Sequence, residues 1–494
     1  MAGESSIASG NRRGSLWERV TTSFWFIPAI LAASGFFLSL ATQPLDGMLQ
    51  GTMDRLPTVI SGGASGASSV LTAISGSLIT VIATVFSLTI VTLTLVSGQY
   101  SPRLVQSFTG DRGLQVVLGT YIGTFVYSLM VLRLVSNSGG GASSFNPAVS
   151  VAVAIILALL CVSMLIYFIN HVAQLIQSST IVLMAHGDTM GLVSGLEDLE
   201  ESSETIRDPE EHPDWAGLLA EPPGVVRARN SGYVESMNLE EILDAVVDEK
   251  TEVVEIPFGP GNFVSSGLPI VKIWPSKNEE LESDAGQRTN RAFVFGKERS
   301  FQQDLAFGLR QLSDIALKGL SPGINDPTTA MQAMDRMEAI FIALGQKSLP
   351  HRVQRREVNE TEVLVKVGYP TFDGLVGLAF DQVRRAAFTS GQVAVLERLL
   401  EILDRALQTN SSDERQQALW DRVFAVARQA PQEISDPHDA ANLVLRAVRV
   451  VRSMTMNQRV SSNKDLDKLA HLSEDLPDKG RIRESIDLLR KRLG

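Results

Sequence analysis

Cysteine is almost absent from this chain. One cysteine, Cys161, occurs among the 494 residues, so a single chain can form neither a disulfide framework nor a cysteine-based metal site. Histidine is scarce as well, and the segment 373–493 holds no histidines at metal-ligand spacing. We therefore expect no metal and no cofactor, and we expect the polar part of the chain to lie in the reducing cytoplasm.

Positive charge is also in short supply. Lys and Arg number 44 against 55 Asp and Glu, so the formal net charge is −11. Nucleic-acid binding requires clustered Lys and Arg, and this balance argues against nucleic acid as a partner. The charges are unevenly placed, because apolar residues crowd before about residue 185 and acidic runs follow, first in the segment 197–211. The two parts of the chain are therefore suited to different solvents.

Familiar catalytic signatures are missing too. The sequence contains no GxxxxGK phosphate loop, no nucleophile elbow and no HExxH zinc motif. An enzyme is therefore the least favoured class, and we expect no catalytic residues. An enzyme would need an unfamiliar active site, for which Asn325 and Asp326 are the candidates.

Long hydrophobic runs, by contrast, are abundant in the first part of the chain. A helix requires roughly 20 apolar residues to cross a bilayer, because unpaired backbone groups are costly in the hydrocarbon core. Four stretches qualify, at 23–45, 70–96, 114–135 and 149–169. We predict a multi-pass membrane protein with the lipid bilayer as its first partner.

The loops between these stretches predict their orientation. The segments 61–69 and 137–144 carry no charge, whereas three arginines precede the first span and Arg103 and Arg112 lie between the second and the third. Cytoplasmic loops are enriched in Lys and Arg, so both termini are predicted to lie in the cytoplasm. An even number of spans agrees with this orientation.

Hydroxyl side chains form a stripe on the second span. Ser77, Thr80, Thr84 and Ser87 recur three and four residues apart, and Thr94 continues the same face. Such residues allow helices to approach closely and to hydrogen-bond across the contact or to their own carbonyls. In a symmetric oligomer the same stripe would instead line a water-accessible pore, and these five residues are the pore-lining candidates.

Charged side chains are absent from the span centres. No Asp, Glu or Lys lies there, which disfavours a proton-coupled transporter and suits a passive pathway for small ions. His171, at the inner end of the fourth span, is a regulatory candidate because histidine titrates near neutral pH, and the alternative is a purely structural role. Gly119 and Gly123 form a GxxxG pattern, which favours close helix contact.

Glycine-punctuated β patterns follow the membrane part. The segment 171–223 is predicted as a helical extension of the fourth span and an acidic linker, and 224–290 as a small β-rich module with one helix at 239–247. The string 261–270 is similar to the hairpin of biotinyl- and lipoyl-carrier modules. No lysine occupies the hairpin tip, so a structural role is the better prediction.

The segment 291–494 is predicted as a cytoplasmic helical domain. Apolar residues recur at helical spacing from Phe301 onward, and helices with short breaks continue to the C-terminus. Its most distinctive string is Ser-Pro-Gly-Ile-Asn-Asp-Pro at 321–327. Asp326 before Pro327 predicts a helix N-cap. Asn325 has no such structural reason and would either orient the loop or contact a ligand, and both residues are ligand or regulatory candidates.

Several strings together resemble one protein family. They are Phe-Ser-Leu-Thr at 86–89, Gln-Tyr-Ser-Pro-Arg at 99–103, Asp-Arg-Gly at 111–113, Ser-Gly-Tyr-Val at 231–234, Gln-Asp at 303–304 and the string at 321–327. In these strings the chain is similar to the bacterial predicted membrane proteins catalogued as domain of unknown function 2254, from the first span to the C-terminal helices. The resemblance implies a location in the bacterial inner membrane, and it carries no established activity.

The predicted fold is mainly α. A cytoplasmic segment (1–22) precedes a four-helix transmembrane domain (23–170), and a cytoplasmic α+β part follows, with the small β-module and then a helical bundle. The leading functional hypothesis is a homo-oligomeric ion channel or pore with a cytoplasmic assembly or regulatory domain, a layout similar to that of bestrophin-type anion channels. The alternative is a membrane-anchored sensor or scaffold that binds a ligand or partner through its cytoplasmic domain.

Overall fold

The computed structural model describes most of the chain. The described residues are 24–53, 63–99, 111–137, 148–175, 177–198, 222–275, 283–350, 352–410, 412–455, 468–471, 476–477 and 479–493. They divide into two compact units, one ending at Ile181 and the other beginning at Val182. Each unit has a hydrophobic core of its own.

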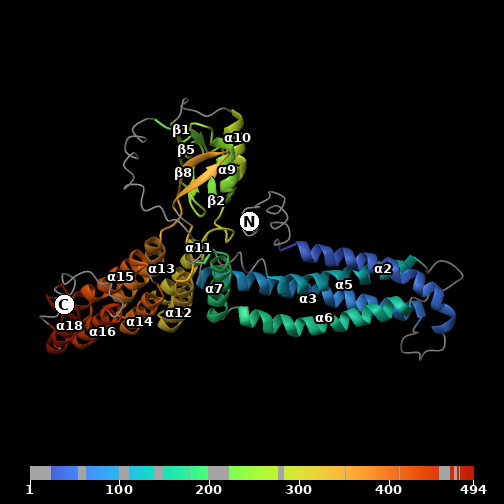
Figure 1. The fold of residues 1–494 in the computed structure, drawn as a ribbon. Helices are drawn as coiled ribbons and strands as arrows, with labels where there is room; N and C mark the ends of the chain where they lie inside the picture. Colours follow the sequence, from blue (N-terminus) through green and yellow to red (C-terminus); the bar gives the residue numbers. More distant parts are fainter. Residues whose placement is uncertain are drawn as a thin grey trace. The chain divides into compact units, whose positions relative to one another are not determined.

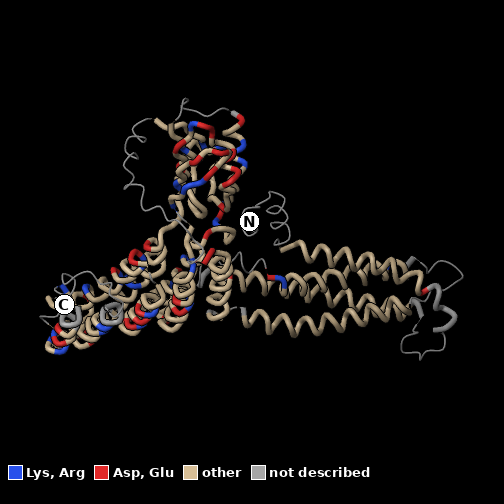
Figure 2. Tube along the Cα trace, in the orientation of Figure 1, with Lys and Arg blue, Asp and Glu red and all other residues tan. Residues whose placement is uncertain are grey.

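Four long apolar helices make up the first unit. They are α2 (Phe26–Met53), α3 (Gly63–Gln99), α5 (Arg112–Asn137) and α6 (Ala148–Leu175). Each contains a stretch of 21 to 30 residues that is long and apolar enough to cross a bilayer, and the four lie side by side (Figure 1). Few charged residues lie on them (Figure 2). The four predicted spans are therefore present in the fold.

Helix α3 is longer than the sequence pattern predicts. The uncharged segment 61–69 is expected to be a loop, whereas α3 begins at Gly63. Small hydroxyl residues are accommodated there because they bond to the helix itself: the Ser69 hydroxyl donates to the Ser65 carbonyl at 2.9 Å. The expected loop therefore adds about two turns to the second span.

Helix α5 is the central helix of this unit. It packs against α2, α3 and α6, and 61% of its most apolar stretch is buried, against 22% for each of the other three. The GxxxG pattern lies at the contact with α2. A Cβ atom added at Gly123 would lie 2.6 Å from the Leu31 carbonyl oxygen, and one added at Gly35 would lie 2.2 Å from the Gly123 carbonyl oxygen. The close helix contact predicted from the glycines is confirmed.

Two β-sheets begin the second unit. Strand order in the first is β1-β5-β3-β8-β7 and in the second β4-β2-β6. The elements are β1 (Gly224–Arg227), β2 (Gly232–Met237), α9 (Leu239–Val246), β3 (Val253–Ile256), β4 (Phe263–Val264), β5 (Pro269–Trp274), α10 (Ser283–Ala292), β6 (Phe293–Gly296), β7 (Val353–Val358) and β8 (Thr361–Val367). The strands and the single helix predicted between 224 and 274 are found close to their expected positions.

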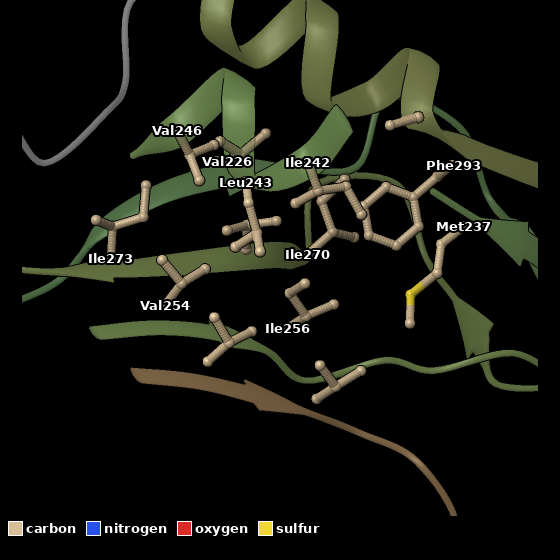
Figure 3. Close-up of a cluster of buried hydrophobic side chains, with 14 of the residues drawn as sticks. Val226, Met237, Ile242, Leu243, Val246, Val254, Ile256, Ile270, Ile273 and Phe293 are labelled. Carbon is tan, nitrogen blue, oxygen red and sulfur yellow. The ribbon is translucent and has the colours of Figure 1, made fainter. Parts of the chain in front are cut away.

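An apolar core joins these sheets to α9. Figure 3 shows side chains from strands and helix meeting there, among them Ile242 and Leu243 from α9 and Val254 and Ile270 from the larger sheet. All four are nearly fully buried. Alternate burial along β2 and β8 agrees with strands that turn one face to this core.

A hairpin from far along the chain completes the larger sheet. Strands β7 and β8 pair with each other, and β8 pairs in parallel with β3, placing Val254 opposite Val365. These strands, and β6 before them, lie in the segment 291–494, for which the sequence predicts helices. Alternation over seven residues is a weak local signal, and the partner of β8 lies more than 100 residues earlier.

Helices make up the rest of the second unit. They are α11 (Leu305–Gly319), α12 (Pro327–Leu344), α13 (Phe372–Thr389), α14 (Val393–Thr409), α15 (Asp413–Glu433), α16 (Pro437–Thr455) and α18 (Lys479–Leu493), and α7 (Ser178–Ser194) spans the division between the units. Asp304 starts α11. It is 2% exposed, accepts from the Phe307 amide, and pairs with Arg299 at 2.7 and 2.8 Å. Its role is therefore structural.

Candidate functional site on helix α3

The hydroxyl stripe of α3 faces away from the other described helices of its own unit. Ser77, Thr80, Thr84, Ser87 and Thr94 are all exposed. The opposite side of the helix is buried and carries the apolar residues Leu71, Leu78 and Val85. At about 100° per residue the two sets lie on opposite faces. The structure therefore places the five candidates together on one outward face.

Small residues extend this face. Ala73, Gly76 and Ala83 lie between the hydroxyls and are exposed, and a Cβ atom added at Gly76 would meet nothing within 4 Å. One larger residue, Val91, interrupts the stripe between Ser87 and Thr94. The outward face of α3 is therefore a narrow strip of small side chains along most of the span.

The stripe hydroxyls donate hydrogen bonds to backbone carbonyls of their own helix. Ser77 donates to the Ala73 carbonyl at 2.8 Å, Thr84 to Thr80 at 2.9 Å, and Thr94 to Ile90 at 2.9 Å. These bonds leave the lone pairs of the hydroxyl oxygens directed outward as acceptors. The face can therefore be solvated by water, or packed against another helix, without unpaired donors.

Helices α2 and α6 expose a different kind of surface. Their outward residues are large and apolar, including Phe37 on α2 and Ile156, Leu159 and Ile166 on α6, each more than 60% exposed. Side chains of this type suit contact with lipid tails. Helix α3 also exposes large apolar residues beside the stripe, among them Ile79 and Phe86. What distinguishes α3 among these three helices is the strip of small and hydroxyl-bearing residues.

A buried polar network joins three helices at the end where α2 finishes and α6 begins. The carboxylate of Asp46, 3% exposed, accepts from the Val149 amide at 2.7 Å and from the hydroxyl of Ser150 at 2.5 Å. The Tyr127 hydroxyl donates to the Ser150 carbonyl at 3.0 Å and lies 3.2 Å from the Thr42 hydroxyl. Asp46 thus caps the N-terminus of α6 from another helix. Asp46 is not among the residues predicted from the sequence, although an acid just past a predicted span was a usable signal.

His171 has a partner at the opposite end of α6. Its Nε2 atom lies 2.9 Å from Oδ1 of Asp111, which also accepts from the Leu114 amide at 2.8 Å. The Tyr167 ring stacks on His171, with centroids 5.2 Å apart, and the group closes over Gly113, where an added Cβ would lie 2.7 Å from Nε2. The regulatory candidate is therefore part of a polar contact between α6 and the start of α5.

The 321–327 loop places its two candidates in different environments. Asp326 caps α12, accepting from the Thr329 amide at 3.0 Å and from its hydroxyl at 2.6 Å. These bonds lower the pKa of Asp326 below its ordinary value. Asn325 adopts a left-handed backbone, with φ of 47°, and its side-chain oxygen accepts from Gln392 Nε2 at 3.0 Å. The predicted cap is confirmed, and Asn325 joins the loop to the start of α14.

Metal-binding geometry is not found in the part of the chain that the structure describes. No three His, Cys, Asp or Glu side chains there come together as a possible ligand set. The described chemistry of the membrane unit consists of hydroxyls, one buried carboxylate and one histidine–aspartate contact.

Comparison with known proteins agrees with this architecture. The family model of predicted membrane proteins called DUF2254, the family that the strings resemble, matches residues 21–405. The chain belongs to this family. Relatives of the DUF2254 chain include uncharacterized proteins of Mycobacterium bovis and of Mycobacterium tuberculosis, each 32% identical over 447 residues, which cover 89% of this chain and 82% of the relative. No solved structure matches it.

Membership covers both units of the DUF2254 chain. The matched residues run from just before α2 to within α14, so the four spans, the two sheets and the 321–327 loop belong to the family domain. The chain is a membrane protein with four transmembrane helices. The family description names no reaction or substrate, and function must be argued from the residues.

Proposed function

We propose that this DUF2254 protein is a homo-oligomeric membrane pore whose subunits turn the outward face of α3 toward a common axis. The observation that carries the proposal is the contrast between that face and those of α2 and α6. Lipid tails gain nothing from hydroxyls and small side chains, whereas a neighbouring helix or a file of water does.

In a symmetric oligomer the stripe would line the pore. Closed homo-oligomers place the same surface of every subunit around one axis. With α3 at that axis, Thr80 and Thr84 would form successive rings of hydroxyls near the middle of the span. Hydroxyl oxygens replace part of the hydration shell of a small ion, and a lining without charge suits passive flow. No catalytic residue is needed for this function.

The single cysteine makes the pore testable by thiol labelling. In a Cys161→Ser background, Thr80→Cys and Thr84→Cys each introduce one thiol on the outward face of α3. We expect a water-soluble methanethiosulfonate reagent to block the current of these variants in planar bilayers. Leu159→Cys on α6 is the matched control, since this exposed position faces lipid, and its current should not change.

Three results would contradict the pore. The first is the absence of current from folded wild-type oligomers over a broad range of ions and pH values. The second is efficient disulfide cross-linking of Thr84→Cys between subunits without any current, which would make the stripe a packing surface only. Equal labelling of Leu159→Cys and Thr84→Cys would remove the distinction on which the proposal depends.

The second candidate function is a membrane-anchored sensor or scaffold. It is favoured by the exposed loop before α12, where Ile324 is 43% exposed and the adjacent Asn325 is fixed by Gln392. A partner that binds this loop should be cross-linked to the full-length wild type in native membranes and lost in Ile324→Asp. Leu488→Asp, on the exposed face of α18, is the control and should keep the partner.

We further propose that the protein lies in a bacterial inner membrane with both termini in the cytoplasm. The basis is the charge bias of the sequence, because the uncharged segment 137–144 and the arginine-bearing segment 101–112 are expected on opposite sides. A fluorescent protein fused to the C-terminus should fluoresce, and alkaline phosphatase fused there should be inactive. The reverse result would invert the topology.

A further inference from the structure

One arginine of the helical part lacks the partners that the other buried arginines have. Arg384 lies on α13, and its Nε and Nη1 atoms are buried without a hydrogen-bond partner among the described residues. A buried guanidinium normally pairs with carboxylates or carbonyls, because removing its N–H groups from water is costly. This position therefore calls for an acceptor that the described residues do not supply.

The neighbouring buried arginines show what satisfied examples look like. Arg415 donates to the carbonyls of Leu344 at 2.7 Å and Lys347 at 3.0 Å. Arg422, on the neighbouring helix α15, pairs with Asp373 and Asp381. Arg384 is thus exceptional within the same bundle, although all three side chains are partly or largely buried.

The charged groups around Arg384 come from α13 and α15. The cations are Arg385 and Arg428, and the anions are Asp381 and Glu433. Burial lowers the pKa of Arg384, the two carboxylates oppose this effect, and the two other guanidiniums add to it. Clustered guanidiniums that depress one another's pKa are relieved when an anion binds among them.

Both nearby carboxylates are already engaged. Asp381 lies 3.4 Å from Nε of Arg422, and Glu433 accepts from Nε2 of Gln429 at 3.1 Å. On α15, positions 422, 429 and 433 share one face by helical spacing, and that face contacts α13. Arg428 is exposed, lies roughly 100° or more around the helix from these three positions, and interacts electrostatically with Arg384. The buried Nε and Nη1 atoms of Arg384 therefore lack an acceptor, and the exposed guanidinium of Arg428 is near enough to interact with Arg384.

We propose that Arg384 and Arg428 form a binding site for a phosphate-type oxyanion between α13 and α15. Guanidinium groups present several N–H donors in a fixed plane that matches the oxygens of phosphate. A phosphate group would supply the acceptors that Nε and Nη1 of Arg384 lack. The group can belong to a free phosphate-bearing molecule or to an anionic lipid, and the two sources share this chemistry.

Thermal unfolding of the full-length protein in detergent tests the site. Inorganic phosphate should raise the melting temperature of the second unit, which begins at Val182, by about 2 to 4 °C relative to sodium chloride at equal ionic strength. Arg384→Met should abolish this shift and raise the melting temperature without phosphate, because an apolar chain replaces an unpaired buried cation. Arg428→Gln should weaken phosphate binding about tenfold. Arg449→Gln removes an exposed arginine of α16 that is not among the charges around Arg384; it is the control and should keep the shift.

A second arm separates the two sources of phosphate. Phosphate-free protein in nanodiscs of phosphatidylglycerol is compared with protein in phosphatidylcholine nanodiscs. Stabilisation by phosphatidylglycerol that Arg384→Met abolishes assigns the site to a lipid headgroup, and stabilisation by free phosphate assigns it to a soluble ligand. The proposal is overturned if neither source stabilises the wild type, or if Arg384→Met and Arg449→Gln respond alike.

Discussion

Single residues hold the membrane unit together where helix ends would otherwise be unsatisfied. The first amide groups of α6 have no partners within their own helix, and Asp46 from α2 accepts from two of them, Val149 and Ser150. The same carboxylate accepts from the Ser150 hydroxyl. A charged acceptor at a helix N-terminus is also favoured by the helix dipole.

We predict that Asp46→Asn destabilises the membrane unit. The substitution replaces a carboxylate by an amide that can accept at only one of its two positions, so buried donors of α6 lose a partner, at a cost of about 1 to 3 kcal/mol. Chemical unfolding in detergent, followed by far-UV circular dichroism, measures the change. Ser163→Ala on the exposed face of α6 removes only a bond to the Leu159 carbonyl and should be nearly neutral. Equal stability of Asp46→Asn and wild type would show that the cap is dispensable.

Residue roles were predictable from sequence when both partners are local. Asp326 before Pro327 indicates a helix start because its acceptor serves an amide three residues on. Asp46 and its amide partner at Val149 are 103 residues apart, and His171 and Asp111 are 60 apart. No local pattern links such pairs, so the sequence indicates His171 without its partner, and the position of Asp46 just past a predicted span does not reveal which amides it caps.

Among the described helices, α2 and α5 have the most extensive contact. Leu31 and Gly35 of α2 pack on Gly119 and Gly123 of α5, where added Cβ atoms would overlap backbone or side-chain atoms. Helix association in a bilayer depends on such close packing, because burial from water contributes little between helices surrounded by lipid. The glycines were a sufficient sequence signal here, since their effect needs only the absence of side chains.

We predict that Gly123→Ala weakens the α2–α5 contact. Its new methyl group must displace the backbone near Leu31, and overpacking of this kind costs about 1 to 3 kcal/mol. The same unfolding assay should show the loss. Gly76→Ala, where an added Cβ meets nothing within 4 Å of the single chain, should leave stability of the monomer unchanged or slightly higher. If Gly123→Ala were as stable as the wild type, the α2–α5 contact would accommodate the added methyl group without loss of stability, and the prediction would be contradicted.

Across the whole molecule, the larger sheet ties together distant parts of the chain through one carboxylate. Glu255 on β3 stands opposite Lys272 of β5 and Lys366 of β8, and it contacts their ammonium groups at 2.9 and 3.3 Å. Burial alone would raise the pKa of Glu255, but the two lysines outweigh it and bring the pKa below its ordinary 4.5.

We predict a pH-dependent contribution from this carboxylate. A group whose pKa is lowered by folding stabilises the fold above its unfolded pKa, and the contribution disappears as the pH falls through the lower folded value. Glu255→Gln should therefore be less stable than the wild type at pH 7 by about 1 kcal/mol. The difference should shrink as the pH falls below the ordinary carboxyl pKa of 4.5 and vanish below the lower folded pKa. Thermal unfolding across that range measures it. Glu362→Gln breaks a well-exposed pair with Arg355 and should cost little at any pH; a matching loss in both variants would contradict the prediction.

The parallel pairing of β3 with β8 also orders events during synthesis. When residues 224–296 leave the ribosome, β3 has β5 on one side and an open edge on the other, because β8 is still to be made. That edge stays unpaired until α11, α12 and then residues up to Val367 have emerged. An open strand edge pairs readily with a neighbouring chain. A fragment that stops near residue 290 therefore keeps this vulnerability permanently, whereas the intact chain carries it only for the time needed to translate the hairpin.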